Sequence, residues 1–250
     1  MRYIQFILLA IVLILGSAIG SKSHAQNVKT YVPPKALPLI PVIKQELEDN
    51  FDYIPQPWFI PALIEHESCI SLRHSKCWSS TSKLSTKWEN GKQRELGAGL
   101  GQLTAAWRKT GELRFDSLSN LKKMYPNELG ALTWDNIDHQ PELQIRAIVL
   151  LTKSDYASFS TVKDPVERLK MTDSAYNGGS RDVHRARKIC GMTQGCDPGI
   201  WFNHVEKHSV KSTKILYANR SPKDINNYHV RDVFLTRMPK YEKLLPKLDQ

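Results

Sequence analysis

The chain has 250 residues and a formal net charge of +10 at pH 7, from 35 Lys and Arg against 25 Asp and Glu. Its hydrophobic fraction of 41% and its charged fraction of 24% are ordinary for a globular protein. This composition excludes a disordered chain and allows a core that folds without cross-links. The positive residues are scattered and form no single run, unlike those of nucleic-acid-binding segments, so we expect no nucleic acid partner.

An almost wholly apolar run over 4–19 follows Arg2 and ends before Ser23-His24-Ala25. A short apolar run that ends in small residues is typical of a secretory signal peptide, whereas a membrane-spanning helix usually needs about 20 apolar residues. We therefore predict a signal peptide at 1–25 and a secreted, periplasmic protein. The alternative is an uncleaved N-terminal membrane anchor, because the run is only slightly short for a span.

The density of proline over 26–42 predicts an extended, Pro-rich leader. A folded domain over 43–250 follows, and we expect it to be single because the sequence has no internal repeat and no clear second domain. A helical pattern covers 42–51, and a second short helix ends near Ser68.

Residues 69–97 are polar, and Asn90-Gly91 stands where a two-residue turn would join two short strands. We predict a small β-hairpin there and a return to helix after Gly99. The segment 143–151, which follows Pro141, is apolar almost all round and predicts a central, buried helix.

Asp164, Pro165 and Glu167 have the order of an N-cap, a first-turn proline and a capping-box glutamate. Gly178-Gly179 ends that helix, and Ser180 is placed to cap the next one.

The last stretch, 226–245, looks helical again and is broken at Pro239. The fold class predicted from these patterns is mainly α, a single helical domain with a small β-hairpin element.

The four cysteines of an exported chain meet oxidising conditions and are expected to form disulfides. Four cysteines allow three connectivities. We favour the local one, Cys69 with Cys77 and Cys190 with Cys196, because each pair brackets turn-like residues.

His204 and His208 admit a metal-binding alternative. With Cys190 and Cys196 they loosely resemble a Cys2His2 zinc site, but the interval from Cys196 to His204 is short for one. The segment 204–208 also lacks the His-Glu-x-x-His order of zinc proteases, and a solvated helix face explains it better. We therefore expect neither a metal nor a cofactor.

Glu67 interrupts an apolar stripe. At 3.6 residues per turn it falls on the same face as Ile60, Leu63 and Ile64, whereas Glu65 points to the opposite face. We therefore expect Glu67 alone of the two to face the interior, where burial raises a carboxyl pKa and suits it to donate a proton near neutral pH. The alternative is a glutamate at a helix edge, exposed to water or paired with an Arg.

Four segments, in order, resemble the motifs of lytic transglycosylases, which cleave the glycan strands of peptidoglycan. Residues 62–68 (Ala-Leu-Ile-Glu-His-Glu-Ser) resemble the Glu-Ser helix, and 97–103 (Gly-Ala-Gly-Leu-Gly-Gln-Leu) the Gly-Leu-Met-Gln motif. Residues 175–179 (Ala-Tyr-Asn-Gly-Gly) match Ala-Tyr-Asn-x-Gly, and 228–233 are similar to the terminal Tyr-Val helix. Each motif is weak alone, but the series covers roughly 55–245 behind a signal peptide.

The resemblance implies a lysozyme-like fold, mostly α with a small β element, and an enzyme that uses one carboxyl as general acid and base. That carboxyl is Glu67. An anionic wall polymer also suits the basic charge, although a plain basic surface without a partner is the alternative. We expect a monomer that acts on peptidoglycan and can serve an envelope-spanning machine. The residues that the motifs assign to substrate binding are Ser68, Gly99, Gln102, Tyr176, Asn177 and Tyr228.

Elementary chemistry supports parts of this assignment. Glycines at 97–101 let the backbone approach a sugar ring, and the amide of Gln102 can both donate and accept hydrogen bonds. A phenol and an amide at 176–177, just before two glycines, can face a cleft. The plain alternatives are a flexible glycine turn and a helix C-cap.

The sequence departs from the family pattern in three places. Gly101 stands where the family usually has Met, and the cysteine-bearing insertion between Ser68 and Gly97 is long, so the shape of the sugar subsites is in doubt. Asn226-Asn227 replace the usual polar pair before Tyr228.

Two rival functions remain open. The first is a hydrolytic muramidase resembling goose-type lysozymes, in which Glu95 would position a water, although Glu95 fits a solvated loop charge equally well. The second is a peptidoglycan-binding module without activity.

Overall fold

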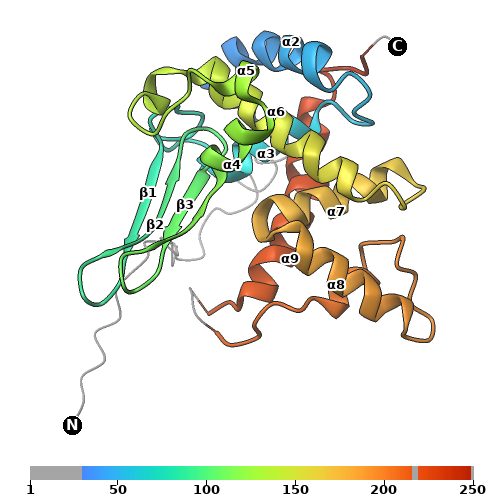
Figure 1. Ribbon diagram of the computed structural model, residues 1–250. Coiled ribbons are helices and arrows are strands. Elements are labelled where there is room, and N and C mark those ends of the chain that lie inside the picture. Colours follow the sequence, from blue (N-terminus) through green and yellow to red (C-terminus); the bar gives the residue numbers. More distant parts are fainter. Residues whose placement is uncertain (1–29, 216–218, 249–250) are drawn as a thin grey trace, which may run out of the picture.

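The computed structural model describes residues 30–215 and 219–248. The predicted signal peptide lies outside them. Figure 1 shows an antiparallel sheet on one side of the molecule and most of the helices on the other. Helix predominates, as the sequence predicted, but the β part is larger than one hairpin. In the part of the chain that is described, no helix is long and apolar enough to cross a membrane.

The sheet is a meander with the strand order β1-β2-β3-β4. Its strands are β1 (Lys83–Lys87), β2 (Gln93–Ala98), β3 (Leu103–Trp107) and β4 (Leu113–Asp116). The predicted hairpin is confirmed as β1 and β2, and Gly91 in the turn between them has φ +80°.

The prediction of helix after Gly99 is wrong, because β3 and β4 follow it. Leu103 and Ala105 of β3 are buried, and Thr104 between them is only half-buried. So short an apolar run suits a strand or a helix equally well by its pattern alone. Pairing of β3 with its neighbours β2 and β4 in the meander decides in favour of the strand.

The leader also differs from its prediction. Pro34–Leu39 forms a short 3₁₀-helix, η1, which runs directly into α2 (Ile40–Asn50). Ala36 is 0% exposed and belongs to the main core. Prolines at the start of a helix lose no hydrogen bond, because their missing N–H would have no partner there, and their φ already suits a helical turn.

The central helix is α6 (Pro141–Ser158), which packs against α2 and α7. It was predicted from its apolar run, and the side chains from Ala147 to Val149 are indeed 0% exposed. Between the sheet and α6 the chain forms three short elements: α4 (Ser117–Met124), α5 (Pro126–Leu129) and η2 (Ile137–His139).

Two helices joined at a glycine follow, α7 (Pro165–Gly178) and α8 (Ser180–Gly191), and then the short η3 (Val205–His208). The predicted cap at Asp164 is confirmed, since its side chain accepts from the N–H groups of Val166 and Glu167. Two details of the predicted helix caps, the roles of Glu167 and Ser180, were wrong. Glu167 contacts Lys170 and the Trp201 N–H instead of closing a capping box, and Gly179, with φ +87°, is the N-cap of α8 in place of Ser180.

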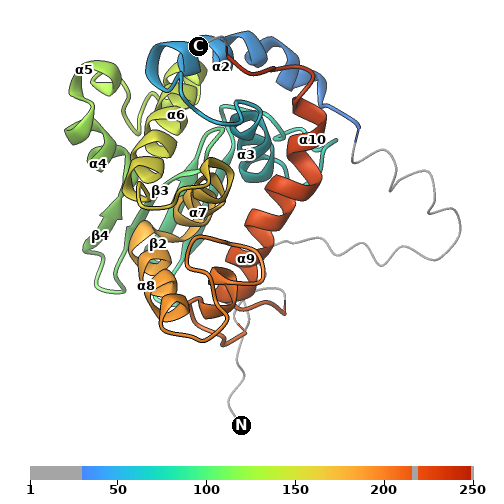
Figure 2. The same ribbon diagram turned by 90° about the vertical axis from the view of Figure 1, so that its right-hand side faces the viewer.

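The C-terminal segment is one nearly continuous column of α9 (Pro222–Asp232), the π-helical η4 (Val233–Arg237) and α10 (Met238–Tyr241). Figure 2 shows this column beside α3 (Phe59–Ser68). The predicted break at Pro239 appears as the π-helical turn just before it, which changes the hydrogen-bond pattern where proline has no N–H to donate.

The predicted disulfide pairing is confirmed: Cys69 is bonded to Cys77, and Cys190 to Cys196. Cys190, Cys196 and His208 do lie close together. The two sulfurs are joined to each other, however, so in this state they offer no thiolate pair to a zinc ion.

Candidate active site

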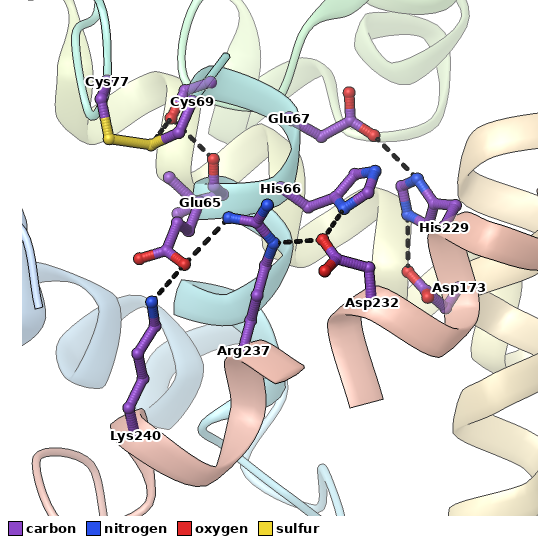
Figure 3. Close-up of polar contacts among 12 residues, drawn as sticks. Glu65, His66, Glu67, Cys69, Cys77, Asp173, His229, Asp232, Arg237 and Lys240 are labelled. Atoms are coloured by element: carbon purple, nitrogen blue, oxygen red, sulfur yellow. Dashed lines mark hydrogen bonds and ion pairs between the residues drawn. A yellow bond between two sulfur atoms is a disulfide. The ribbon is translucent and has the colours of Figure 1, made fainter. Parts of the chain in front are cut away.

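The two glutamates of α3 lie in different environments. The prediction that Glu67 is largely buried with a raised pKa is confirmed, but the expectation that Glu65 points away from the interior is wrong. Glu65 is 0% exposed, whereas the Glu67 side chain is 16% exposed and faces a cleft. Figure 3 shows their carboxyls on different sides of the helix. The helical-face argument assumed that one side of α3 meets water, but η4 and α10 cover the side that carries Glu65.

Glu65 is neutralised by the C-terminal column. Its carboxylate accepts from Arg237 Nη1 at 2.9 Å and from Tyr241 Oη at 2.5 Å, and Lys240 Nζ lies 2.5 Å away. A fully buried carboxylate with three such donors is a structural anchor and has no access to a substrate.

Glu67 opens onto a cleft with a volume of about 250 Å³. Burial raises the pKa of Glu67 from its ordinary value to about 7; the charge of His229 opposes this, and that of Asp173 adds to it. A carboxyl in this state keeps its proton close to neutral pH and still reaches the cleft, which are the two requirements of a general acid. The other residues that line the cleft are Leu84, Thr86, Glu95, Gly97, Gln102, Thr104, Tyr176 and Asn177.

The sheet supplies one wall of the cleft. Thr86 on β1 pairs with Glu95 on β2, and Gly97 on β2 pairs with Thr104 on β3, so these side chains share one face. Sequence reasoning missed Leu84, Thr86 and Thr104, since none of them lies in a recognised motif. Alternation along correctly predicted strands is the signal that would have found them.

A tight turn between β2 and β3 places Gln102. Gly99 has φ +79°, and Gln102 itself has φ +47°, which is unusual for a residue with a side chain. The Gln102 amide donates to the Gly99 carbonyl at 2.9 Å and lines the cleft. Gly99 is not among the lining residues; a Cβ there would stand 2.5 Å from Gln144 Oε1, so its role is to shape the turn.

Gly101, where the family has Met, has no room for a side chain. A Cβ on Gly101 would approach Tyr176 Oη to 2.5 Å and would also collide with Ile148. The Tyr176 hydroxyl instead donates to the Gly101 carbonyl at 2.7 Å. The tyrosine ring, held by this bond, therefore lines the cleft beside the place that a larger residue would take.

Asn177 is oriented by a residue that departs from the family pattern. Asn226 is 2% exposed, and its amide nitrogen donates to Asn177 Oδ1 at 3.0 Å. The other end of the Asn226 amide accepts from the Ser174 hydroxyl at 2.8 Å, which fixes its direction. The Asn177 amide nitrogen is thus the end turned away from Asn226.

Besides Gly99, two more of the predicted substrate-binding residues, Ser68 and Tyr228, lie outside the lining of the cleft. Ser68 is buried; its hydroxyl donates to the Ile64 carbonyl at 2.7 Å and accepts from the Trp78 N–H at 3.1 Å. It therefore ties the end of α3 to the disulfide loop. Tyr228 is 46% exposed, and the guanidinium of Arg220 lies 4.3 Å from its ring.

A buried histidine and aspartate stand behind Glu67. Nδ1 of His229, on α9, lies 3.6 Å from Glu67 Oε1, and Nε2 of the same ring lies 3.0 Å from Asp173 Oδ1, on α7. Figure 3 shows the three side chains in a row. His229 lies within the fourth motif, 228–233, but neither His229 nor Asp173 was singled out from the sequence. Their signal was an ionisable residue inside an otherwise buried helix face.

No protein-family model and no curated protein matches this chain.

Glu95 is a second carboxyl in the same cleft. It is more exposed than Glu67, with 41% of its side chain in contact with solvent, and Arg114 Nη2 lies 3.7 Å away. The two carboxyls thus differ in environment, one buried beside a histidine and the other open to water and next to a guanidinium.

Proposed function

We propose that this protein is an exported peptidoglycan lytic transglycosylase with a lysozyme-like fold, and that Glu67 is its single general acid and base. One observation carries the proposal: a mostly buried carboxyl with a pKa of about 7 opens onto the same cleft as Gln102, Tyr176 and Asn177. These are the residues to which the resemblance assigns sugar binding, and they come from three distant parts of the chain.

In the proposed reaction, Glu67 gives its proton to the glycosidic oxygen between N-acetylmuramic acid and N-acetylglucosamine. The bond from that oxygen to C1 breaks, and its electron pair stays on the oxygen. The muramyl C6 hydroxyl then attacks C1 and returns its proton to Glu67, which forms a 1,6-anhydro ring. The neighbouring acetamido group stabilises the cationic intermediate, so no second carboxylate is needed.

The other cleft residues bind and orient the sugar in this proposal. The Gln102 and Asn177 amides donate to and accept from hydroxyl or N-acetyl groups, and the Tyr176 ring packs against a sugar face. The glycines at 97 and 101 keep the cleft wall thin enough for a pyranose to reach Glu67.

Export and the partners belong to the same proposal. Two disulfides suit an oxidising compartment, and the basic charge suits an anionic wall polymer. We propose a periplasmic or secreted monomer that opens the wall locally for an envelope-spanning machine.

Replacement of Glu67 by Gln tests the catalyst. We expect the purified E67Q protein to release fragments from sacculi at least 100-fold more slowly than the parent, on the order of the general acid–base contribution, because the amide of Gln has no acidic proton to transfer. The control is Glu89→Gln, the same chemical change at a side chain that is 91% exposed, which should leave the rate unaltered. If E67Q lyses sacculi as fast as the parent, Glu67 is not the catalyst. If the parent itself releases no fragments, the protein is a module that only binds peptidoglycan.

A hydrolytic muramidase is the second candidate, and the presence of Glu95 in the cleft favours it. In that reaction Glu95 would position a water to attack C1. Mass spectrometry of the fragments separates the two, since a hydrolytic product is heavier by one water than an anhydro product. For a transglycosylase we expect anhydro products from both the parent and Glu95→Gln, whereas loss of activity in E95Q together with hydrated products would favour the muramidase.

A further inference from the structure

The pair formed by Asp173 and His229 takes no part in the two proton transfers proposed for Glu67, yet it lies against that carboxyl. His229 is 1% exposed and Asp173 is 0% exposed, so neither lines the cleft. Two of their atoms, His229 Nδ1 and Asp173 Oδ2, are buried and have no hydrogen-bond partner among the described residues. A buried ring nitrogen without a partner is uncommon in a folded protein and calls for an explanation.

The partner that the geometry offers to His229 Nδ1 is Glu67. The Oε1 atom lies 3.6 Å away, and a small rotation of either side chain would bring the two atoms into hydrogen-bond range. Catalytic hydrogen bonds are often this long before substrate is bound and shorten in the complex. The opposite ring nitrogen is held by Asp173 at 3.0 Å, so the ring cannot turn away without losing that bond.

We propose that His229, held by Asp173, is a positioning residue that fixes which oxygen of Glu67 faces the substrate and stabilises its carboxylate between the two proton transfers. This inference rests on the proposed function.

The protons can be followed through the cycle. His229 keeps both of its ring protons throughout, with Nε2–H donated to Asp173 and Nδ1–H donated to Glu67 Oε1. The acid proton therefore sits on the other oxygen, Oε2, where it can reach the glycosidic oxygen. After that transfer Glu67 is a carboxylate that still accepts from Nδ1–H, and the proton of the C6 hydroxyl restores the acid.

Two histidines lie side by side near Glu67, and their pKa values are shifted in opposite directions. The ring of His66 lies 4.1 Å from that of His229, centroid to centroid, and His66 Nδ1 contacts Asp232 at 2.7 Å. Burial, helped by the charge of His229, lowers the pKa of His66 to about 3, so His66 is neutral. Burial lowers the pKa of His229 too, but the charge of Asp173 and the hydrogen bond to it outweigh burial and raise that pKa above its ordinary value.

Other ionisable groups surround Glu67 on every side. His66 is its neighbour on α3, Tyr176 and Asp173 come from α7, and Arg237 comes from η4. Glu95 stands on the sheet wall of the cleft. Of the two basic side chains near Glu67 whose pKa is raised, Arg237 is already paired with Asp232 and Glu65. The ring of His229 is the one turned to Glu67.

The test compares three variants of the purified protein on sacculi and on a soluble muropeptide: His229→Gln, His229→Asn and Asp173→Asn. Asn places its amide near the position of Nδ1, whereas Gln reaches towards Asp173. D173N keeps an oxygen that can accept from Nε2–H but removes the charge. His74→Gln, at an exposed position in the loop between Cys69 and Cys77, is the matched control.

For H229Q we expect kcat to fall about 10- to 100-fold with KM within about 3-fold of the parent. The alkaline limb of the pH profile should move to higher pH, because the charge of His229 lowers the pKa of Glu67. H229N should recover part of the rate, D173N should lie between the parent and H229Q, and H74Q should match the parent.

Two results would overturn the inference while leaving the proposed function intact. In one, H229Q keeps the parental kcat and pH profile. In the other, both His229 variants lose rate equally, in proportion to their loss of thermal stability, and the alkaline limb stays in place, which indicates a purely structural pair. Failure of the proposed function is seen elsewhere: the parent would release no anhydro product, or E67Q would remain active.

Discussion

At the scale of single residues, α3 carries two glutamates, two positions apart, whose surroundings differ. Glu65 has three donors, while among the described residues Glu67 has none within hydrogen-bond distance, and burial raises its pKa to about 7. The same residue type therefore anchors the fold at one position and, in our proposal, reacts at the other. What differs is the number of positive or donating groups around each carboxyl.

The raised pKa of Glu67 predicts a pH-dependent cost to stability. Its pKa is about 7 in the folded protein against 4.5 ordinarily, so folding favours the protonated form, and stability is lost as pH rises from 4.5 through 7. The shift corresponds to an upper limit of about 3 kcal/mol. We expect E67Q, which cannot ionise, to unfold at a higher temperature than the parent at pH 8 and at the same temperature near pH 4.

Thermal denaturation measured at several pH values checks this. Asp155, whose pKa burial raises to about 7, is present in both proteins and cancels in the difference. A difference in melting temperature that does not grow between pH 4.5 and 7 would show that Glu67 is not desolvated in the folded protein.

At the scale of elements, the cleft depends on how closely the β2–β3 turn approaches two helices. Ile148 of α6 and Tyr176 of α7 both stand where a side chain on Gly101 would be. The resemblance to lytic transglycosylases places Gly101 where that family usually has Met, but only the approach of two helices from later in the chain shows that this turn has no room for a side chain.

We therefore expect Gly101→Ala to lower the free energy of unfolding by about 1–3 kcal/mol, since the turn or the helices must shift to admit the methyl group. Displacement of the Tyr176 hydroxyl should also lower activity. The control is Gly191→Ala on α8, where an added Cβ would meet Pro198 Cγ at an ordinary 3.5 Å. Denaturant unfolding and the rate of sacculus lysis measure both effects, and unaltered values for G101A would show that the turn has room to spare.

At the scale of the whole molecule, α3, near the start of the described chain, packs against the C-terminal column of η4 and α10. Glu65 on α3 contacts Arg237 and Lys240, which lie more than 170 residues further along the chain. The contact holds α3, and Glu67 with it, against α9 and its His229 (Figures 2 and 3).

Glu65→Gln should therefore act in the opposite direction to E67Q, although both make the same change on one helix. It removes the carboxylate that Arg237 and Lys240 share, although Arg237 keeps its pairing with Asp232, and loss of one partner from a buried ion pair costs about 3–5 kcal/mol. We expect E65Q to lose stability at all pH values at which the parent is folded. Parallel unfolding curves of the two variants test this, and a neutral E65Q would mean that Arg237 and Lys240 find other acceptors.

The sequence alone determined those features that depend on neighbours along the chain. The disulfide pairing followed from turn-like loops, the α6 helix from an apolar run, the Asp164 cap from its position and the first hairpin from Asn90-Gly91. The motifs also pointed to Glu67, Gln102, Tyr176 and Asn177, which do line one cleft.

Only the tertiary structure decided which side of α3 is covered. Periodicity gives the angle between Glu65 and Glu67, but the column that buries Glu65 comes from the far end of the chain. The same holds for β3 and β4, whose strand state depends on pairing, and for His229, whose partner Asp173 lies on another helix. Burial and charge around a side chain are sums over groups brought together by folding, and a local pattern does not contain them.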